Sequence, residues 1–263
     1  MKSRETESIR LPGRRAGALA GIFAVALISS AFANSGGTTA PASLATIQDS
    51  DKLADRAKRA GQVLTELMRV ADSAPPASLL RQATCLAAVP GVVQVGLGVG
   101  GRVGFGLASC RKGSGWSAPT FMALKGGSIG LQIGGQSADM VLVFTNENAA
   151  KTIAASTFNL GGQASVAAGP VGRNVSAETD YKARAEIYSY SKTKGLFAGI
   201  DLSGTKWEVD TKANAKVYGP LPTTTADHDG VGALLARDGA SAPAGVQPFI
   251  ASLQKNMPAE GAP

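Results

Sequence analysis

The sequence has little of what enzymes and metal proteins commonly use. It contains one histidine, two cysteines and 5% aromatic residues. The histidine, His228, lies between Asp227 and Asp229 in a segment rich in proline and threonine, with no second histidine to complete a metal site. A hydrolytic triad needs a base beside its nucleophile, and no G-x-S-x-G nucleophile turn is present. We therefore expect a protein that is not an enzyme and that binds neither metal nor cofactor.

Long apolar runs are also lacking, except near the N-terminus. Five basic residues are followed by the apolar stretch AGALAGIFAVALISS and by the small-x-small triplet Ala31-Phe32-Ala33. This order is typical of a signal peptide, so we expect residues 1–33 to be removed by cleavage after Ala33. The alternative is an uncleaved membrane anchor. Export would place a bacterial protein in the periplasm or outside the cell.

The charge balance is mildly basic. The formal net charge is +7, and removal of residues 1–33, with five basic and two acidic residues, would lower it to +4. Such a charge suits association with an anionic surface better than a nucleic-acid site, which needs a concentrated basic stripe. We expect no nucleic acid among the partners.

The stretch VGLGVGGRVGFGL, residues 95–107, contains the letters of a dinucleotide-binding G-x-G-x-x-G fingerprint. That fingerprint requires a helix after the glycines. Here the odd positions from Val95 to Leu107 are almost all apolar and the even ones are mostly glycine, which is the period-two pattern of a strand. The pattern predicts a β-hairpin with a turn at 100–102 and one face stripped of side chains, used for close packing or left as an acyl-chain groove.

The chain divides into segments of different texture. Residues 34–48 resemble a linker, and 49–82 contain a predicted amphipathic helix over 49–72 that ends before Pro75-Pro76. Its apolar stripe predicts packing against the domain, with an interfacial helix on a membrane as the alternative. Residues 83–219 are rich in glycine and β-like, and 220–263 resemble a proline-containing tail with one short helix at 245–256.

Within 83–219 three segments have clear patterns. MVLVF (140–144) predicts a central strand covered on both faces, 146–156 predicts a short helix, and 185–204 predicts a hairpin with a Lys-Thr-Lys-Gly turn. The fold class is therefore α+β, with a curved antiparallel sheet or small β-barrel-like core, an N-terminal amphipathic helix and marginal short helices.

The cysteines, Cys85 and Cys110, leave two alternatives. In an oxidising compartment they would form a disulfide closing a loop of about 25 residues. The alternative is a pair of buried thiols.

Five stretches resemble the SYLF domain family in their order and spacing. They are GVGGRVGFG near residue 100, GWSAP at 115–119, AAGPVGRN at 167–174, YSYSKTKGLFAGIDLSG at 188–204 and NAKVYG at 214–219. The resemblance covers about 83–219, and it implies a lipid-binding module without enzymatic activity. Family members in fungi and animals occur in endocytic proteins, and the fungal ones are described as actin-binding.

Cations in glycine-rich turns are suited to hold phosphate headgroups, together with backbone N–H groups. We expect lipid contacts from two sets of side chains, one in the turns and one on the N-terminal helix: Arg102, Arg173, Lys192 and Lys194, with Arg56 and Arg59. The expected function is an exported module that recognises anionic phospholipid headgroups at a membrane surface. The alternative is an envelope protein-interaction or scaffold domain with incidental lipid contact.

Overall fold

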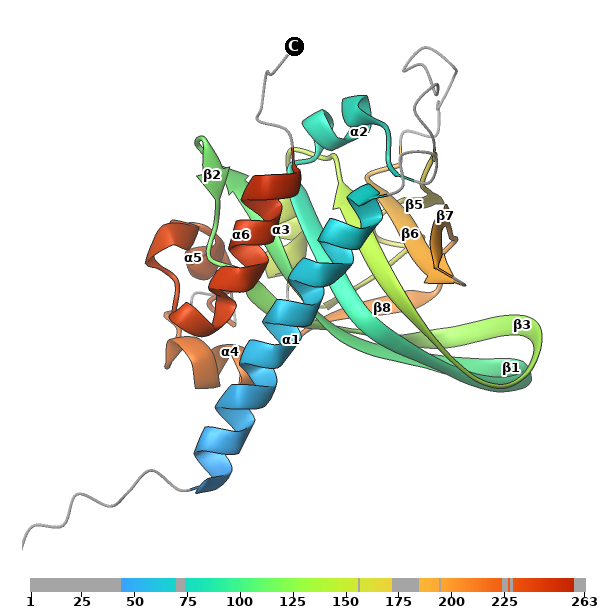
Figure 1. The fold of residues 1–263 in the computed structure, drawn as a ribbon, viewed down its shortest axis with the longest axis horizontal. Helices are drawn as coiled ribbons and strands as arrows, with labels where there is room; N and C mark the ends of the chain where they lie inside the picture. The colour runs from blue at the N-terminus through green and yellow to red at the C-terminus, as the bar shows by residue number, and fades with distance from the viewer. Residues whose placement is uncertain are drawn as a thin grey trace, which may run out of the picture. The chain divides into compact units, whose positions relative to one another are not determined.

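The computed structural model describes residues 44–69, 74–155, 157–171, 185–193, 195–223, 227 and 229–257. Two strands dominate this part of the chain, β1 (Cys85–Lys112) and β3 (Thr120–Phe144). They pair antiparallel along their lengths, from Cys85 opposite Phe144 to Ala108 opposite Thr120. Figure 1 shows them as one long, curved ribbon that extends away from the helices.

The strand expected from the alternation of residues 95–107 is confirmed, but the predicted turn at 100–102 is wrong. β1 continues through these residues, and Val99 is opposite Ile129 instead of Val103. The chain reverses later, through β2 (Gly115–Trp116) and a turn in which Gly113 has a φ of 55°. Glycine allows a strand to bend as readily as it allows a tight turn, so the spacing alone did not separate the two.

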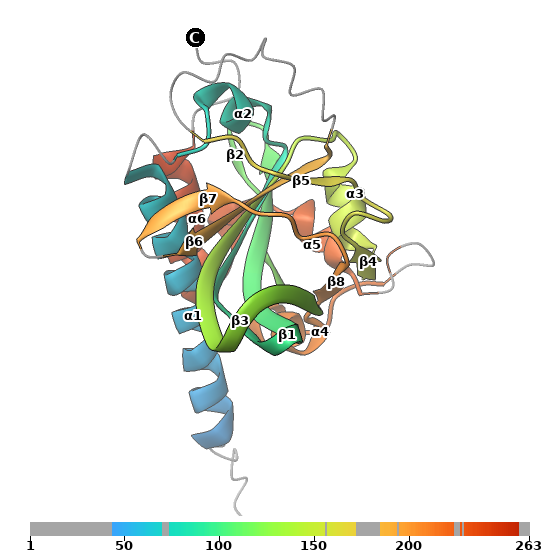
Figure 2. The ribbon, with the colours of Figure 1, turned by 90° about the vertical axis from the view of Figure 1, so that its right-hand side faces the viewer.

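β1 curls so strongly that its two halves pack against each other. A Cβ atom placed on Gly106 would lie 2.2 Å from the carbonyl oxygen of Ala88, and one on Gly104 would lie 2.6 Å from a methyl carbon of Val92. These two glycines therefore serve close packing, one of the two uses expected of the stripped face. Figure 2 shows the resulting half-barrel from the end at which the β1–β3 ribbon extends toward the viewer.

A disulfide joins the two ends of this curl. Cys85 and Cys110 are bridged, with Cα atoms 3.9 Å apart. The two ends of β1 also meet through the backbone, where the N–H of Arg111 donates to the carbonyl oxygen of Thr84 at 2.8 Å. The bridged alternative is confirmed.

The remaining strands flank β3. Its C-terminal half pairs with β6 (Ile187–Thr193), which also pairs with β5 (Val166–Ala168) and β7 (Leu196–Gly199). Its N-terminal half pairs with β8 (Thr205–Val209), and β8 pairs with β4 (Thr157–Asn159). The central strand at 140–144 and the hairpin within 185–204 are both confirmed. The expected α+β fold with a curved antiparallel sheet is confirmed as a half-barrel, in which β5 and β6 are the parallel pair among the described strands.

Helix α1 (Leu44–Arg69) packs on the outer face of the sheet beside α6 (Gln247–Asn256) and near α4 (Thr211–Tyr218) (Figure 1). Its apolar stripe is buried, with Leu64 and Leu67 fully covered. The packing alternative for this helix is confirmed. The helix begins at Leu44, inside the segment interpreted as a linker.

The C-terminal region contributes more to the core than its proline-containing sequence indicates. It forms α5 (Val231–Leu235), two short 3-10 turns, η1 (Gly239–Ser241) and η2 (Ala244–Val246), and α6. Phe249, Ile250 and Leu253 are buried in the cluster that includes α1. The described residues between 44 and 257 belong to one compact unit, so the packed domain includes residues beyond 219.

Two apolar clusters lie on opposite faces of the sheet. One joins the outer face to α1 and α6, and also contacts α2 (Ala77–Gln82). The other fills the inside of the curl, where Trp207 stacks on Phe158, and it is closed by α5 and α3 (Ala149–Ala154), the short helix expected within 146–156. The curl therefore gives the sheet an inner face and an outer face with separate cores.

Reduction of the disulfide is expected to lower the free energy of unfolding by about 3 kcal/mol, because the bridge restricts a 25-residue loop in the unfolded chain. Denaturant unfolding with and without reductant measures this. A double Cys85→Ala, Cys110→Ala variant should be insensitive to reductant. Equal midpoints for the oxidised and reduced wild-type chain would contradict a structural role for the bridge.

Candidate functional site

The outer face of the β1–β3 ribbon carries four apolar side chains that remain about half exposed among the described residues. Val93, Val95, Val103 and Phe105 are 44%, 54%, 40% and 42% exposed. Val93 and Val95 lie on one half of β1, and Val103 and Phe105 lie on the other. Alternation places all four on the outer face of the ribbon, opposite the face through which the two halves pack. Soluble proteins rarely leave such side chains together on the surface unless they serve an interaction.

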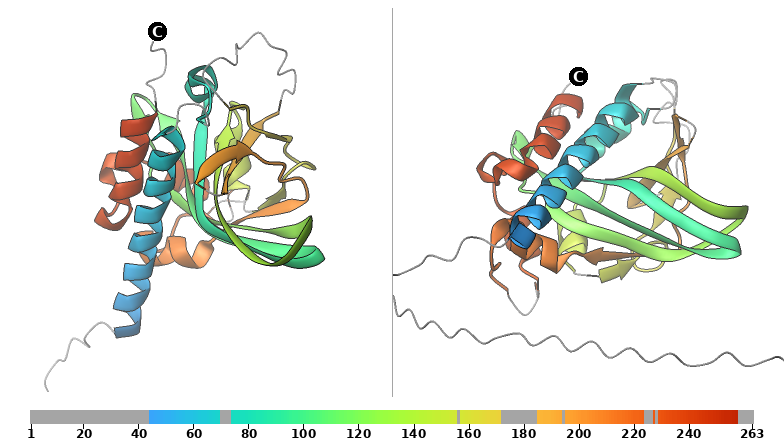
Figure 3. Two further views of the ribbon diagram at one scale, coloured as in Figure 1. Left: turned by 45° about the vertical axis from the view of Figure 1, so that its right-hand side comes forward. Right: turned by 60° about the horizontal axis from the view of Figure 1, so that its bottom comes forward.

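This face continues the outer core beyond the helices. Leu107 and Phe121 on the same face are fully buried under α1, whereas the neighbouring Phe105 is half exposed. In the right-hand view of Figure 3 the ribbon extends well past the helices that cover its base. We call Val93, Val95, Val103 and Phe105 the outer apolar row.

Cations lie beside the outer apolar row. The guanidinium of Arg56 lies 5.2 Å from the ring centre of Phe105, and its Nη1 also pairs with Asp210 at 3.1 Å. Lys125, opposite Val103 in the register, pairs with Glu208. The hydrogen bonds that Glu208 accepts from Lys125 and Lys206 lower the pKa of its carboxyl group.

The described site residues expected from the sequence lie in two places: Arg56, Arg59 and Lys192 lie on or beside α1, and Arg102 lies on the other face of the sheet. Arg59 is exposed on α1 and pairs with Asp55 at 2.8 Å. Arg102 lies half-buried on the inner face of the sheet, and burial lowers the pKa of its guanidinium. Arg173 and Lys194 lie outside the described residues.

Lys192 has a structural role that the sequence did not indicate. Its ammonium group pairs with the carboxylate of Glu66, which joins β6 to α1 across 126 residues of sequence. Alternation and turn chemistry gave no signal for this pair, because the partner lies on a distant helix.

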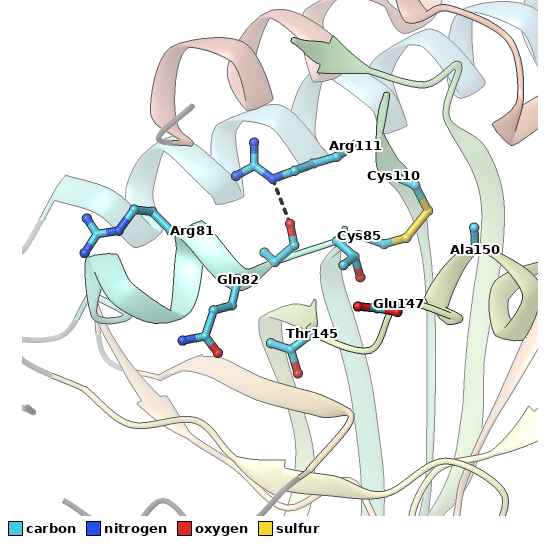
Figure 4. A pocket seen from close by; sticks show the side chains of 10 residues that line it. Arg81, Gln82, Cys85, Cys110, Arg111, Thr145, Glu147 and Ala150 are labelled. Atoms are coloured by element: carbon cyan, nitrogen blue, oxygen red, sulfur yellow. Dashed lines mark hydrogen bonds between the residues drawn. A yellow bond between two sulfur atoms is a disulfide. The ribbon is translucent and has the colours of Figure 1, made fainter. Parts of the chain in front are cut away.

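A cavity of about 540 Å³ lies beside the disulfide, between α2 and the loop before α3 (Figure 4). Arg81, Gln82 and Glu147 are among the residues that line it. Arg111 is committed to the backbone there: it donates to the carbonyl oxygens of Ala83 at 2.8 Å and Leu80 at 3.1 Å. These bonds satisfy carbonyl groups at the end of α2.

The described residues contain no group of three His, Cys, Asp or Glu side chains placed to hold a metal ion. His228 lies outside them. No helix within the described ranges is long and apolar enough to cross a membrane.

Comparison with known proteins identifies similar sequences in one protein family. A family model described as "Las17-binding protein actin regulator", Ysc84, matches residues 125–255. SH3 domain-containing protein PJ696.02 of Schizosaccharomyces pombe is 37% identical over 175 residues, which are 63% of this chain and 40% of that protein.

Two further relatives show the same pattern. LAS seventeen-binding protein 3 of Saccharomyces cerevisiae is 34% identical over 176 residues, covering 64% of this chain and 38% of the relative. SH3 domain-containing YSC84-like protein 1 of Xenopus laevis is 33% identical over 174 residues, covering 64% and 52%. The chain thus spans about two fifths to one half of the length of these relatives.

The family model covers this chain from within β3 to α6, and two of these relatives are named as SH3 domain-containing proteins. The chain belongs to the Ysc84 family, that of the SYLF domain. The family expected from the five sequence motifs is confirmed.

The Glu66–Lys192 pair predicts a stability effect at the hairpin. Lys192→Glu should lower the free energy of unfolding by up to about 1 kcal/mol, because it places two carboxylates together at a partly exposed site. The charge swap Glu66→Lys with Lys192→Glu should recover most of the loss. Thermal unfolding of the four chains measures the coupling, and strict additivity of the two changes would argue against the pair.

Proposed function

We propose that the domain is a non-enzymatic module that binds anionic phospholipid surfaces through the outer apolar row. The observation that carries this proposal is the set of four half-exposed apolar side chains on one face of the ribbon. Partial insertion of the row into the headgroup region would remove its apolar surface from water, at about 25 cal/mol per Å².

Charge supports an anionic surface as the partner. Lys125 and Lys206 lie on the outer face beside the row, and Arg56 and Arg59 lie on the neighbouring helix. Each cation near an anionic membrane contributes up to about 1 kcal/mol, and salt screens this attraction within about 10 Å at 0.1 M. Glu208, Asp210 and Asp55 pair with these four cations and offset most of their charge, so the apolar row supplies the larger share of binding.

The place of action belongs to the same proposal. The basic and apolar pattern of residues 1–33 supports export of the chain to the periplasm or beyond, with peripheral attachment to a membrane there. Mass measurement of the protein recovered from an exporting bacterial host tests this. A mass lower by residues 1–33 supports cleavage after Ala33, and an intact N-terminus contradicts it.

The names of the relatives support a second candidate. LAS seventeen-binding protein 3 is named for a protein that it binds. The outer apolar row would then contact an envelope protein, and lipid contact would be incidental. Capture of one stoichiometric partner from detergent-free envelope extract, lost in a Val95→Glu variant that binds vesicles normally, would favour this second function.

Vesicle sedimentation tests the first proposal. Val95→Glu should weaken binding to vesicles containing phosphatidylglycerol by at least about tenfold. The lost apolar contact and the repelled carboxylate each cost about 1 kcal/mol, and 1.4 kcal/mol corresponds to tenfold. Because Val95 is 54% exposed, the melting temperature of the Val95→Glu variant should differ little from that of the wild-type chain.

The matched control is Val171→Glu, at a valine that is 38% exposed in the loop after β5. It should bind as the wild-type chain does. Equal losses in both variants, or equal and negligible sedimentation of the wild-type chain with neutral and anionic vesicles, would overturn the proposal.

A further inference from the structure

The inner face of the sheet holds polar side chains next to its apolar core. Arg102 on β1, Gly126 on β3 and Thr205 on β8 are neighbours in the strand register. Gly126 has no side chain, and a Cβ there would lie 2.8 Å from the Cα of Thr205 and 3.3 Å from its hydroxyl oxygen. A side chain at position 126 would therefore collide with Thr205, and the glycine allows β8 to approach β3 closely beside Arg102.

Polar atoms on this face are buried without partners. The Nε and Nη1 atoms of Arg102, the hydroxyl of Thr205 and the indole Nε1 of Trp207 have no hydrogen-bond partner within the described part of the chain. Thr205 and Trp207 are fully buried. Trp207 follows Thr205 by two residues on β8, and hence lies on the same face.

Such atoms are costly to leave unpaired. A buried polar group without a partner loses about 1–3 kcal/mol relative to its hydrated state, and more when it is charged. The guanidinium of Arg102 stays protonated, because its pKa begins far above neutrality and the nearby Asp201 carboxylate opposes the effect of burial. Asp201 itself accepts hydrogen bonds from the N–H and hydroxyl of Ser203, at 2.8 and 2.7 Å.

The unpaired set is rich in donors. Arginine and tryptophan nitrogens can only donate, and the threonine hydroxyl can donate as well. A ligand that satisfies them must bring acceptors, and a charged guanidinium binds carboxylate and phosphate oxygens most strongly.

We propose that Arg102 and Thr205 form a binding site for an oxyanion, a phosphate or carboxylate group, on the inner face of the half-barrel. Trp207 lies in the same face beside it. This site is separate from the proposed membrane contact, because alternation places Arg102 on the face opposite Val103. It does not depend on vesicle binding, and either proposal can fail alone.

Nuclear magnetic resonance with the full chain tests the site. Inorganic phosphate or acetate, added at constant ionic strength against sodium chloride, should shift the Arg102 Nε–H signal in a saturable manner. The same anion should leave the Nε–H signal of Arg69, an exposed arginine at the end of α1, unchanged. Absence of a saturable shift at Arg102 with every anion tested would overturn the proposal.

Two variants and one control sharpen the test. Arg102→Gln should weaken anion binding at least about tenfold, whereas Arg69→Gln, at an exposed arginine in the last turn of α1, should leave it unchanged. Thr205→Val removes the unpaired hydroxyl at nearly constant volume. It should bind anion more weakly while its melting temperature without anion is no lower than that of the wild-type chain. A clear fall in that melting temperature would show that the hydroxyl is already satisfied, and would contradict the proposal.

The source of the oxyanion is distinguished by a soluble lipid. Dihexanoyl phosphatidic acid carries the phosphate on a short-chain lipid, and dihexanoyl phosphatidylcholine, whose net charge is zero, is the control. Tighter binding of the phosphatidic acid than of inorganic phosphate, lost in Arg102→Gln, supports a lipid headgroup. Equal binding of the two supports a free anion. A structure of the anion-soaked protein with only ordered water beside Arg102 and Thr205 would overturn both.

Discussion

The packing of β1 on itself is the contact on which the rest of the structure depends. Gly104 and Gly106 allow the second half of the strand to meet Val92 and Ala88 at distances that no larger residue would permit. The Cys85–Cys110 bridge then ties the two ends of the curl together. A flat ribbon of the same length would expose both faces, and a curled one encloses a core inside and leaves a surface for helices outside.

Both proposed binding surfaces follow from that curl. The helices α1 and α6 cover the base of the outer face, and the ribbon beyond them keeps its apolar side chains exposed (Figures 1 and 3). On the inner face the apolar core reaches Trp207, and the next row contains the unpaired donors of Arg102 and Thr205. One bend therefore separates an apolar surface suited to a bilayer from a donor-rich site suited to an anion.

Local patterns in the sequence predicted many of the helices and strands. Alternation predicted the strand through 95–107, and the apolar run MVLVF predicted the central strand. The spacing of leucines in 49–72 predicted the packed helix. Each pattern depends on neighbours within a few residues. The turn at 100–102 was wrong because glycine permits bending and reversal alike. Residues 231–257 were interpreted as part of a tail, because the burial of Phe249 depends on α1, almost 200 residues earlier. The candidate site was the part least predictable from the sequence, because it depends on contacts between distant segments. Lys192 pairs with Glu66 of α1, and Val95 is exposed because α1 does not extend over that part of the sheet.

The depth of position 95 in a bilayer tests the central claim most directly. The two native cysteines are bridged, so a nitroxide attached to Val95→Cys can be compared with one at Val171→Cys on anionic vesicles. If the outer apolar row inserts into the bilayer, the label at 95 should collide with dissolved oxygen and be shielded from an aqueous nickel chelate. The label at 171 should remain accessible to the chelate. Equal access of the chelate to both labels on membrane-bound protein would contradict insertion of this face.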